Sequence, residues 1–243
     1  MLNNLSTTSI LNIPFVNESF DTFMTQIKND INLHENRFVI TANPEIAVHA
    51  YDNKDYLDLI KKSDYVVPDG IGIVNASKEF STPIKERISG YDIFCDLLKW
   101  GNENNKSAYF IGSKPEVITD LQKKLNQDYP TLQIKGIHDG YFNNPNEILN
   151  EIKHTKPDMV FVGLGFPKQE EFIDKHRPIN NGLWIGLGGS FDVMSGHVKR
   201  APKFWINHHL EWLYRFITQP TRFKRMLAIP KFLRLVKKQK KDN

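Results

Sequence analysis

Between about residues 37 and 188, short apolar runs alternate with longer amphipathic segments, and this alternation limits the possible folds more than any other feature. The predicted strands cover residues 37–41, 65–67, 108–111, 132–137, 159–163 and 183–187. Most are nearly continuous apolar runs, which indicates burial on both faces, as in a parallel sheet. The pattern predicts an α/β fold with a doubly wound, mostly parallel Rossmann-like sheet. In such folds, ligands bind at the carboxyl ends of the strands.

Local signals mark the starts of three predicted helices. Asn43 precedes a Pro-Glu pair, and Ser113 stands just before a Lys-Pro-Glu segment, so each offers a capping side chain near a proline and an acid. Pro167 likewise opens a predicted helix over residues 168–175. These helices fall between predicted strands, as the doubly wound fold requires.

Composition excludes several classes of protein. With 243 residues, of which 40% are hydrophobic and 12% aromatic, the chain has enough apolar surface to fold. No run reaches the roughly 18 apolar residues of a membrane-spanning helix, and the N-terminal segment does not resemble a signal peptide. The single cysteine, Cys95, excludes an internal disulfide and fits a reducing compartment. We therefore expect a cytoplasmic location.

Charge is distributed unevenly along the chain. Residues 199–243 hold 13 lysines and arginines against two acids, Glu211 and Asp242, which gives +11. The other 198 residues hold 19 basic and 26 acidic side chains, which gives −7. The sequence therefore predicts an α/β catalytic domain over residues 1–195 and a basic helical C-terminal appendage over residues 196–243. Within it, helices are expected over residues 204–217, 221–229 and 231–240.

The basic appendage has three possible interpretations. Its large apolar residues alternate with arginines and lysines, which is typical of helices that lie on an anionic membrane surface. Nucleic acid is a second anionic partner of the right charge. Alternatively, the aromatic residues pack on the α/β body and the charges are only solvated. We favour membrane docking.

Two predicted strand ends carry side chains suited to chemistry. Thr41 and Asn43 follow the first strand, and Asp69 follows the second, ahead of Gly70 and Gly72. Asn43 could serve only as a helix cap, and so could Asp69. A carboxylate beside a dry strand end can nevertheless have its pKa raised, as a general base needs.

Arg87 and two glycine-rich turns complete the candidate site. Arg87 precedes a helix start, and the turns at residues 163–171 and 186–192 each follow a strand, a layout that suits phosphate binding. The third glycine of the dinucleotide fingerprint and the Gly-Lys-Ser/Thr of a P-loop are missing. There is also no Asp-x-Asp pair, and adjacent His208 and His209 would point to different faces of a helix. We therefore expect no metal site and no cofactor.

Six motifs, in order, resemble the WecG/TagA/CpsF glycosyltransferase family, most closely its TagA/TarA branch. They are Thr41-Ala42-Asn43-Pro44-Glu45, Pro68-Asp69-Gly70-Ile71-Gly72, Arg87 with Gly90-Tyr91-Asp92, Gly140-Tyr141-Phe142, Gly163-Leu164-Gly165-Phe166-Pro167-Lys168-Gln169-Glu170 and Gly188-Gly189-Ser190-Phe191-Asp192. Each motif is weak alone, but the ordered set, spread over about residues 38–225, is specific.

The resemblance implies a reaction in wall teichoic acid assembly. N-acetylmannosamine would pass from UDP-N-acetylmannosamine to the 4-hydroxyl of N-acetylglucosamine on undecaprenyl diphosphate, with inversion to a β-linked disaccharide. It also implies oligomers in solution and a site that the C-terminal tail completes at the inner face of the cell membrane, where the protein would be peripheral.

The resemblance also assigns roles to residues. Asp69 would be the general base and Thr41 its hydroxyl partner or a sugar-orienting group, while Asn43 and Gln169 would bind substrate. Phosphate oxygens would be bound by arginines, namely Arg87, Arg215, Arg222 and Arg225. Tyr141 and Asp192 are candidates for contact with the uracil.

Two other functions remain open. A transferase of the same family could use glucose or N-acetylmannosaminuronate in place of N-acetylmannosamine. A nucleotide- or nucleic-acid-binding protein without catalysis would use its basic appendage to bind phosphates. The second alternative leaves Thr41 and Asp69 without a role, and we expect no nucleic-acid partner.

Overall fold

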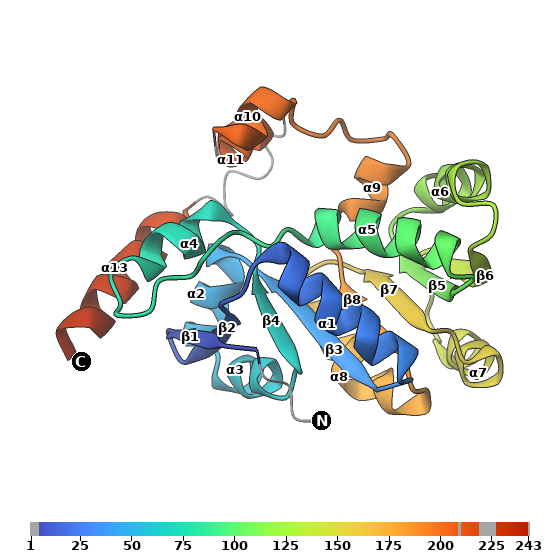
Figure 1. Cartoon of the computed structure of the whole chain (residues 1–243), viewed down its shortest axis with the longest axis horizontal. Coiled ribbons are helices and arrows are strands. Elements are labelled where there is room, and N and C mark those ends of the chain that lie inside the picture. Colours follow the sequence, from blue (N-terminus) through green and yellow to red (C-terminus); the bar gives the residue numbers. More distant parts are fainter. Residues whose placement is uncertain (1–4, 209, 219–226, 243) are drawn as a thin grey trace.

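The computed structural model describes residues 5–208, 210–218 and 227–242. Within these ranges, eight strands form one sheet in the order β1-β2-β4-β3-β8-β7-β5-β6 (Figure 1). The strands are β1 (Thr7–Ile10), β2 (Ile13–Val16), β3 (Arg37–Ala42), β4 (Tyr65–Pro68), β5 (Ser107–Gly112), β6 (Gln133–His138), β7 (Met159–Gly163) and β8 (Leu183–Gly186). All neighbours are parallel except β1 and β2. The predicted α/β fold with a mostly parallel sheet is confirmed.

Helices cover both faces of the sheet, so the described chain has three layers (Figure 1). One face packs against α1 (Phe20–Asn32), α5 (Gly90–Glu103), α6 (Pro115–Asp128) and α9 (Ser190–Met194). The other packs against α2 (Pro44–Asp52), α3 (Lys54–Lys61), α4 (Ile71–Ser77), α7 (Asn146–Thr155), α8 (Lys168–His176) and α13 (Ala228–Asp242). Successive strand residues supply the two cores in turn, as Phe38, Val39 and Ile40 do in β3. Burial on both faces explains the continuous apolar runs.

The order of the strands places a topological switch point between β3 and β8, and the carboxyl edge there is called the crevice below. The chain leaves β3 for α2 on one face of the sheet, and it leaves the adjacent β8 for α9 on the opposite face. The two connections therefore diverge at the carboxyl ends of these strands. In open α/β sheets such a point is where ligands bind.

The N-terminal hairpin of β1 and β2 is not predicted by the sequence. Each strand has only four residues, and the turn between them consists of Leu11 and Asn12, both with positive φ angles of 51° and 63°. Turns of this kind favour Asn and Gly, whereas leucine rarely adopts this conformation. The turn therefore lacks a clear signal in the sequence.

One predicted helix cap is wrong and two helix starts are confirmed. Asn43 Oδ1 accepts a hydrogen bond from Ile46 N at 3.1 Å and caps α2, and Pro167 directly precedes α8. Ser113 does not cap α6, because α6 follows Lys114 and the Ser113 hydroxyl donates to Asp192 Oδ2 at 3.2 Å instead. With φ at 61°, Ser113 lies outside the extended conformation typical of a cap residue.

The C-terminal segment differs from the three expected helices. The first is split into α10 (Lys203–Asn207) and α11 (Glu211–Thr218), and the second falls mostly outside the described residues. Pro230 does not separate two helices but lies in the first turn of α13, where its missing N–H costs no helical hydrogen bond. Figure 1 shows α10 and α11 beyond the carboxyl end of the sheet, while α13 lies beside α2 and α4.

The helix α13 belongs to the packed body. Phe232 and Val236 are fully buried in the core on the α2 face. Lys240 pairs with Glu79 at 2.6 Å, and Leu11 N donates to Gln239 Oε1 at 2.8 Å, so the helix also contacts the N-terminal hairpin. Phe232 and Val236 therefore pack inward, whereas Leu233 of the same helix is exposed.

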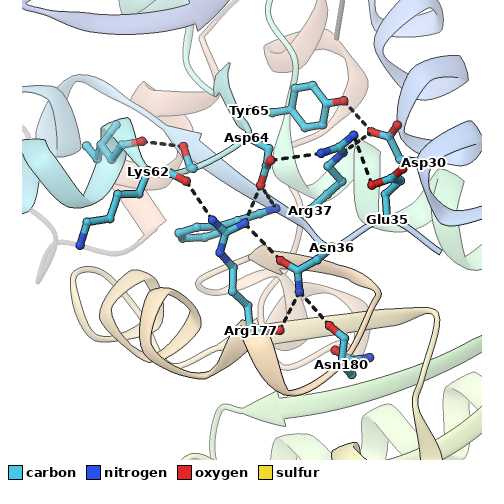
Figure 2. A network of polar contacts seen from close by, with 12 residues as sticks. Asp30, Glu35, Asn36, Arg37, Lys62, Asp64, Tyr65, Arg177 and Asn180 are labelled. Carbon is cyan, nitrogen blue, oxygen red and sulfur yellow. Dashed lines mark hydrogen bonds and ion pairs between the residues drawn. The ribbon is translucent and has the colours of Figure 1, made fainter. Parts of the chain in front are cut away.

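A polar network ties the amino ends of β3 and β4 together, at the edge opposite the crevice (Figure 2). Asp64 accepts hydrogen bonds from Phe38 N at 2.8 Å and from Arg177 Nη1 at 2.6 Å. Arg37 lies between Asp64 and Asp30, at 3.4 and 3.2 Å. The network fixes this end of the sheet, and the predicted site residues lie outside it.

Candidate active site

Thr41 and Asn43 lie at the carboxyl end of β3. The Thr41 hydroxyl donates to the carbonyl oxygen of Gly186 at 3.0 Å, across the crevice between β3 and β8. Gly90 lies against the same threonine, and a Cβ at Gly90 would come within 2.9 Å of Thr41 Cγ2. Asn43 caps α2, so its position is explained by the helix it starts. The end of β3 thus meets both β8 and the start of α5.

Asp69 follows β4 and faces the same edge. Its backbone N–H donates to Ala42 O at 2.9 Å, and its Oδ2 accepts from Gly90 N at 3.3 Å. Asp69 is not the cap of α4, because that helix follows Gly70 and has no side-chain cap. Gly70 has a φ of 146°, which only glycine adopts readily, and this turn directs the chain away from the carboxylate. The Asp69 side chain keeps 30% of its surface exposed, so a ligand can reach it.

Arg87 connects Asp69 with the C-terminal segment. Its Nη2 lies 3.5 Å from Asp69 Oδ1 and 2.9 Å from Glu211 Oε2, while its side chain is only 18% exposed. Burial alone would lower the pKa of the guanidinium, but the charges of Asp69 and Glu211 more than offset it, and the pKa lies above its ordinary value. Arg87 is therefore a fixed positive charge beside the Asp69 carboxylate.

Glu211 is a site residue that sequence reasoning missed. It starts α11 and is nearly buried, with 8% of its surface exposed. The only sequence signal was that it is one of two acids among 13 basic residues. A carboxylate so placed holds α11 over the site through Arg87.

Gln169 and Glu170 start α8 beside the glycine-rich turn that follows β8. Gln169 Oε1 accepts from Gly188 N at 2.9 Å, and its Nε2 donates to Glu170 Oε1 at 2.7 Å. The Gln169 side chain lies on Gly186, the residue whose carbonyl binds Thr41. Gln169 is therefore joined to Thr41 through one strand end.

The remaining predicted site residues are less closely connected. Tyr141 is 71% exposed in the loop after β6, and Asp192 in α9 accepts from Ser113 Oγ at 3.2 Å. Within the described residues, the hydrogen bonds and ion pairs of these two do not include Thr41, Asp69 or Arg87. Arg215 belongs to α11, and Arg222 and Arg225 lie outside the described residues, as does His209.

The described residues contain neither a metal-binding cluster nor a membrane-spanning helix. Over residues 5–208, 210–218 and 227–242, no three His, Cys, Asp or Glu side chains cluster closely enough to hold a metal ion. In the same ranges, every helix is too short or too polar to cross a lipid bilayer. The arrangement at β3, β4 and β8 offers one carboxylate that can accept a proton and one guanidinium that can bind an anion.

Comparison with known proteins identifies the family. The chain is 42% identical over 240 residues to an N-acetylglucosaminyldiphosphoundecaprenol N-acetyl-beta-D-mannosaminyltransferase of Bacillus subtilis, covering 98% of this chain and 94% of that protein. Proteins of the same name from Bacillus spizizenii and Staphylococcus aureus are 40% and 35% identical over 239 and 242 residues, covering 98% of this chain and 93% and 95% of theirs. The family model described as "Glycosyl transferase WecG/TagA/CpsF family" matches residues 8–243. The chain therefore belongs to the WecG/TagA/CpsF glycosyltransferase family.

Proposed function

We propose that this protein transfers N-acetylmannosamine from UDP-N-acetylmannosamine to the 4-hydroxyl of N-acetylglucosamine on diphospho-undecaprenol, with inversion, in the synthesis of the teichoic acid linkage unit. The names of the three relatives support the sugar and the lipid-linked acceptor. The observation that carries the proposal is the Asp69 carboxylate at the carboxyl edge of the sheet, 3.5 Å from the Arg87 guanidinium.

In the proposed mechanism, Asp69 is the general base. Its carboxylate takes the proton of the acceptor 4-hydroxyl as that oxygen bonds to the anomeric carbon of the donor. The bond between the anomeric carbon and the phosphate oxygen breaks on the opposite side, UDP leaves with the electron pair, and the configuration inverts. One carboxylate is sufficient for this step, because no covalent intermediate needs to form.

Positive charge stabilises the leaving diphosphate. Arg87 is held close to the Asp69 carboxylate, and Arg215, Arg222 and Arg225 of the appendage are assigned to phosphate oxygens. Asn43 and Gln169 bind the donor, Thr41 orients the sugar or Asp69, and Tyr141 and Asp192 contact the uracil. The Arg87–Glu211 ion pair supports a site that is formed jointly by the α/β domain, residues 1–195, and the appendage, residues 196–243.

A test of the proposed base compares Asp69→Asn with the wild-type protein. UDP release is measured with UDP-N-acetylmannosamine and a short-chain lipid-diphosphate N-acetylglucosamine, and UDP affinity is measured separately. We expect the variant to lose turnover while its UDP affinity changes little, because the amide cannot accept the proton but keeps the shape of the carboxylate. Unchanged turnover in Asp69→Asn would eliminate this role, and a panel with UDP-glucose and UDP-N-acetylmannosaminuronate decides the donor.

The proposal extends to an anionic membrane surface, where the protein is peripheral on the inner face, and to oligomers in solution. The basic appendage, with a charge of +11, supports attraction to anionic lipids. Arg222→Glu is expected to reduce both turnover and co-sedimentation with phosphatidylglycerol vesicles, with phosphatidylcholine vesicles as the control. If neither quantity falls, the appendage has only a structural role.

A further inference from the structure

Glu170 is a fully buried acid to which the proposed mechanism gives no task. It lies in the first turn of α8, next to Gln169, and none of its surface is exposed. Acids are rarely buried to this degree unless a specific interaction retains them. Its Oε1 has one such interaction, the hydrogen bond from Gln169 Nε2 at 2.7 Å.

The Glu170 carboxyl lies near Tyr56, which belongs to a small aromatic cluster. His49, Tyr56 and Phe166 pack edge to face, with ring centroids 4.9 to 5.4 Å apart, and the buried Tyr56 hydroxyl faces the carboxyl group. The nearest like charge is Glu171, on the same helix. Burial raises the pKa of Glu170 to about 7, although the hydrogen bond from Gln169 and the nearby Tyr56 hydroxyl act in the opposite direction. Keeping an acid in this place costs stability, which indicates a role other than packing.

The two partners of the Gln169 amide fix its orientation. Oε1 accepts from the backbone N–H of Gly188 at 2.9 Å, while Nε2 donates to Glu170 at 2.7 Å. Rotation of the amide by 180° would set its NH₂ group against the Gly188 N–H and its oxygen against the Glu170 oxygen. The contact with the Gly188 N–H would then be repulsive, and so would the contact with the ionised Glu170 carboxylate. Glu170 is therefore one of the two groups that decide which way the amide points.

The fixed amide places its hydrogen-bond donor, Nε2, at the carboxyl end of β8. Nε2 lies over Gly186, where an added Cβ would come within 2.7 Å of it, so the approach requires glycine at this position. The carbonyl of Gly186 is the group that binds the Thr41 hydroxyl. Among the described residues, the second N–H of Gln169 Nε2 has no acceptor.

We propose that Glu170 is a positioning residue that holds the Gln169 amide so that its remaining N–H points to the carboxyl end of β8 and binds an acceptor oxygen of the sugar nucleotide. The identity of that ligand rests on the function proposed above. The orientation of the amide does not, because it follows from the contacts with Glu170 and Gly188. A flipped amide would offer the ligand an oxygen and would repel the same group.

Variants of Glu170 and its neighbours distinguish a role in positioning the Gln169 amide from a role in packing. Glu170→Met removes the acceptor at similar volume, whereas Glu170→Gln keeps an oxygen that Gln169 can use. We expect Glu170→Met to raise KM for UDP-N-acetylmannosamine about tenfold with a smaller change in kcat, and Glu170→Gln to restore KM. Tyr56→Phe, which alters the same pocket without touching Gln169, and Glu171→Gln, on the same helix, serve as controls that keep the wild-type KM.

A double-mutant cycle tests whether Glu170 acts through Gln169. In the Gln169→Ala background, Glu170→Met is expected to produce no further rise in KM. An equal rise in both backgrounds would overturn the proposal. So would a rise in KM for Tyr56→Phe as large as that for Glu170→Met, because packing would then explain both.

A measurement on the wild-type protein requires neither a folded Glu170→Met variant nor turnover. The side-chain NH₂ signals of Gln169 are followed in protein labelled with ¹⁵N-glutamine and assigned by their loss in Gln169→Ala. We expect these signals to shift with pH around 7, as the acceptor carboxyl titrates. Signals that stay at the positions of a solvent-exposed glutamine amide throughout this pH range would overturn the contact. If the wild-type protein fails to turn over UDP-N-acetylmannosamine, the proposed function fails while this measurement still decides the position of the amide.

Discussion

The substitution Glu170→Gln should make the protein more stable at neutral and alkaline pH. Burial raises the pKa of this carboxyl from an ordinary value of 4.5 to about 7 in the folded protein. Between these values the folded state binds the proton more tightly than the unfolded state, so the free energy of unfolding falls as pH rises through the interval. Above pH 7 the loss is complete.

The size of the effect follows from the interval. At about 1.4 kcal/mol per pH unit, the distance from 4.5 to about 7 amounts to about 3 kcal/mol of unfolding free energy. The amide that Glu170→Gln introduces does not titrate, and it can still accept from Gln169. The advantage of the variant over the wild-type protein should therefore grow by about 3 kcal/mol between pH 4.5 and pH 8.

Urea unfolding of both proteins at several pH values measures this difference. Trp184 is fully buried in the sheet, so its fluorescence reports the loss of the core. Other groups titrate equally in the two proteins, and their contributions cancel in the difference. If the two curves of unfolding free energy against pH run parallel from 4.5 to 8, the reasoning about Glu170 is wrong.

Two further predictions concern stability away from the crevice. Asp64→Ala leaves Arg177 and Phe38 N without their carboxylate, which should lower the free energy of unfolding by about 2 kcal/mol. Asp174→Ala removes one partner of an exposed ion pair and should lower it by under about 1 kcal/mol in the same urea experiment. A similar loss for the two variants would refute the importance of the network. Phe232→Ala removes a fully buried ring between α13 and the α2 face and should cost about 3 to 5 kcal/mol. A loss below about 1 kcal/mol in thermal or urea unfolding would mean that α13 does not stay docked in solution.

Apolar periodicity was sufficient to predict the central sheet but not the contacts between its ends. The run at 159–163 coincides with β7 because both faces of that strand are buried and glycine ends it. The β1–β2 hairpin was missed because Leu11 carries no turn signal, and Ser113 was assigned to a cap because local sequence does not show its bond to Asp192. Such features depend on tertiary structure, so the secondary-structure propensities of the residues cannot predict them.

The same limit applies to the candidate site. Thr41 and Asp69 could be found because each ends a strand, and parallel strands bring their carboxyl ends to one edge. Glu211 meets Arg87 from a position 124 residues later in the chain, and Gln169 at the start of α8 meets Gly188, which comes after β8. Pairings over such distances follow from how the elements pack, which a single sequence does not reveal.

The packing of α13 on α2 sets an order for folding during synthesis. α2 starts at Pro44, at the carboxyl end of β3, whereas the residues that cover its outer face, Phe232 and Val236, are translated almost 200 residues later. Domains assemble from the N-terminus as the ribosome works, so this apolar face stays uncovered until α13 leaves the exit tunnel. A nascent chain stalled before Phe232 would be a substrate for chaperones. Once α13 has emerged, it would displace them.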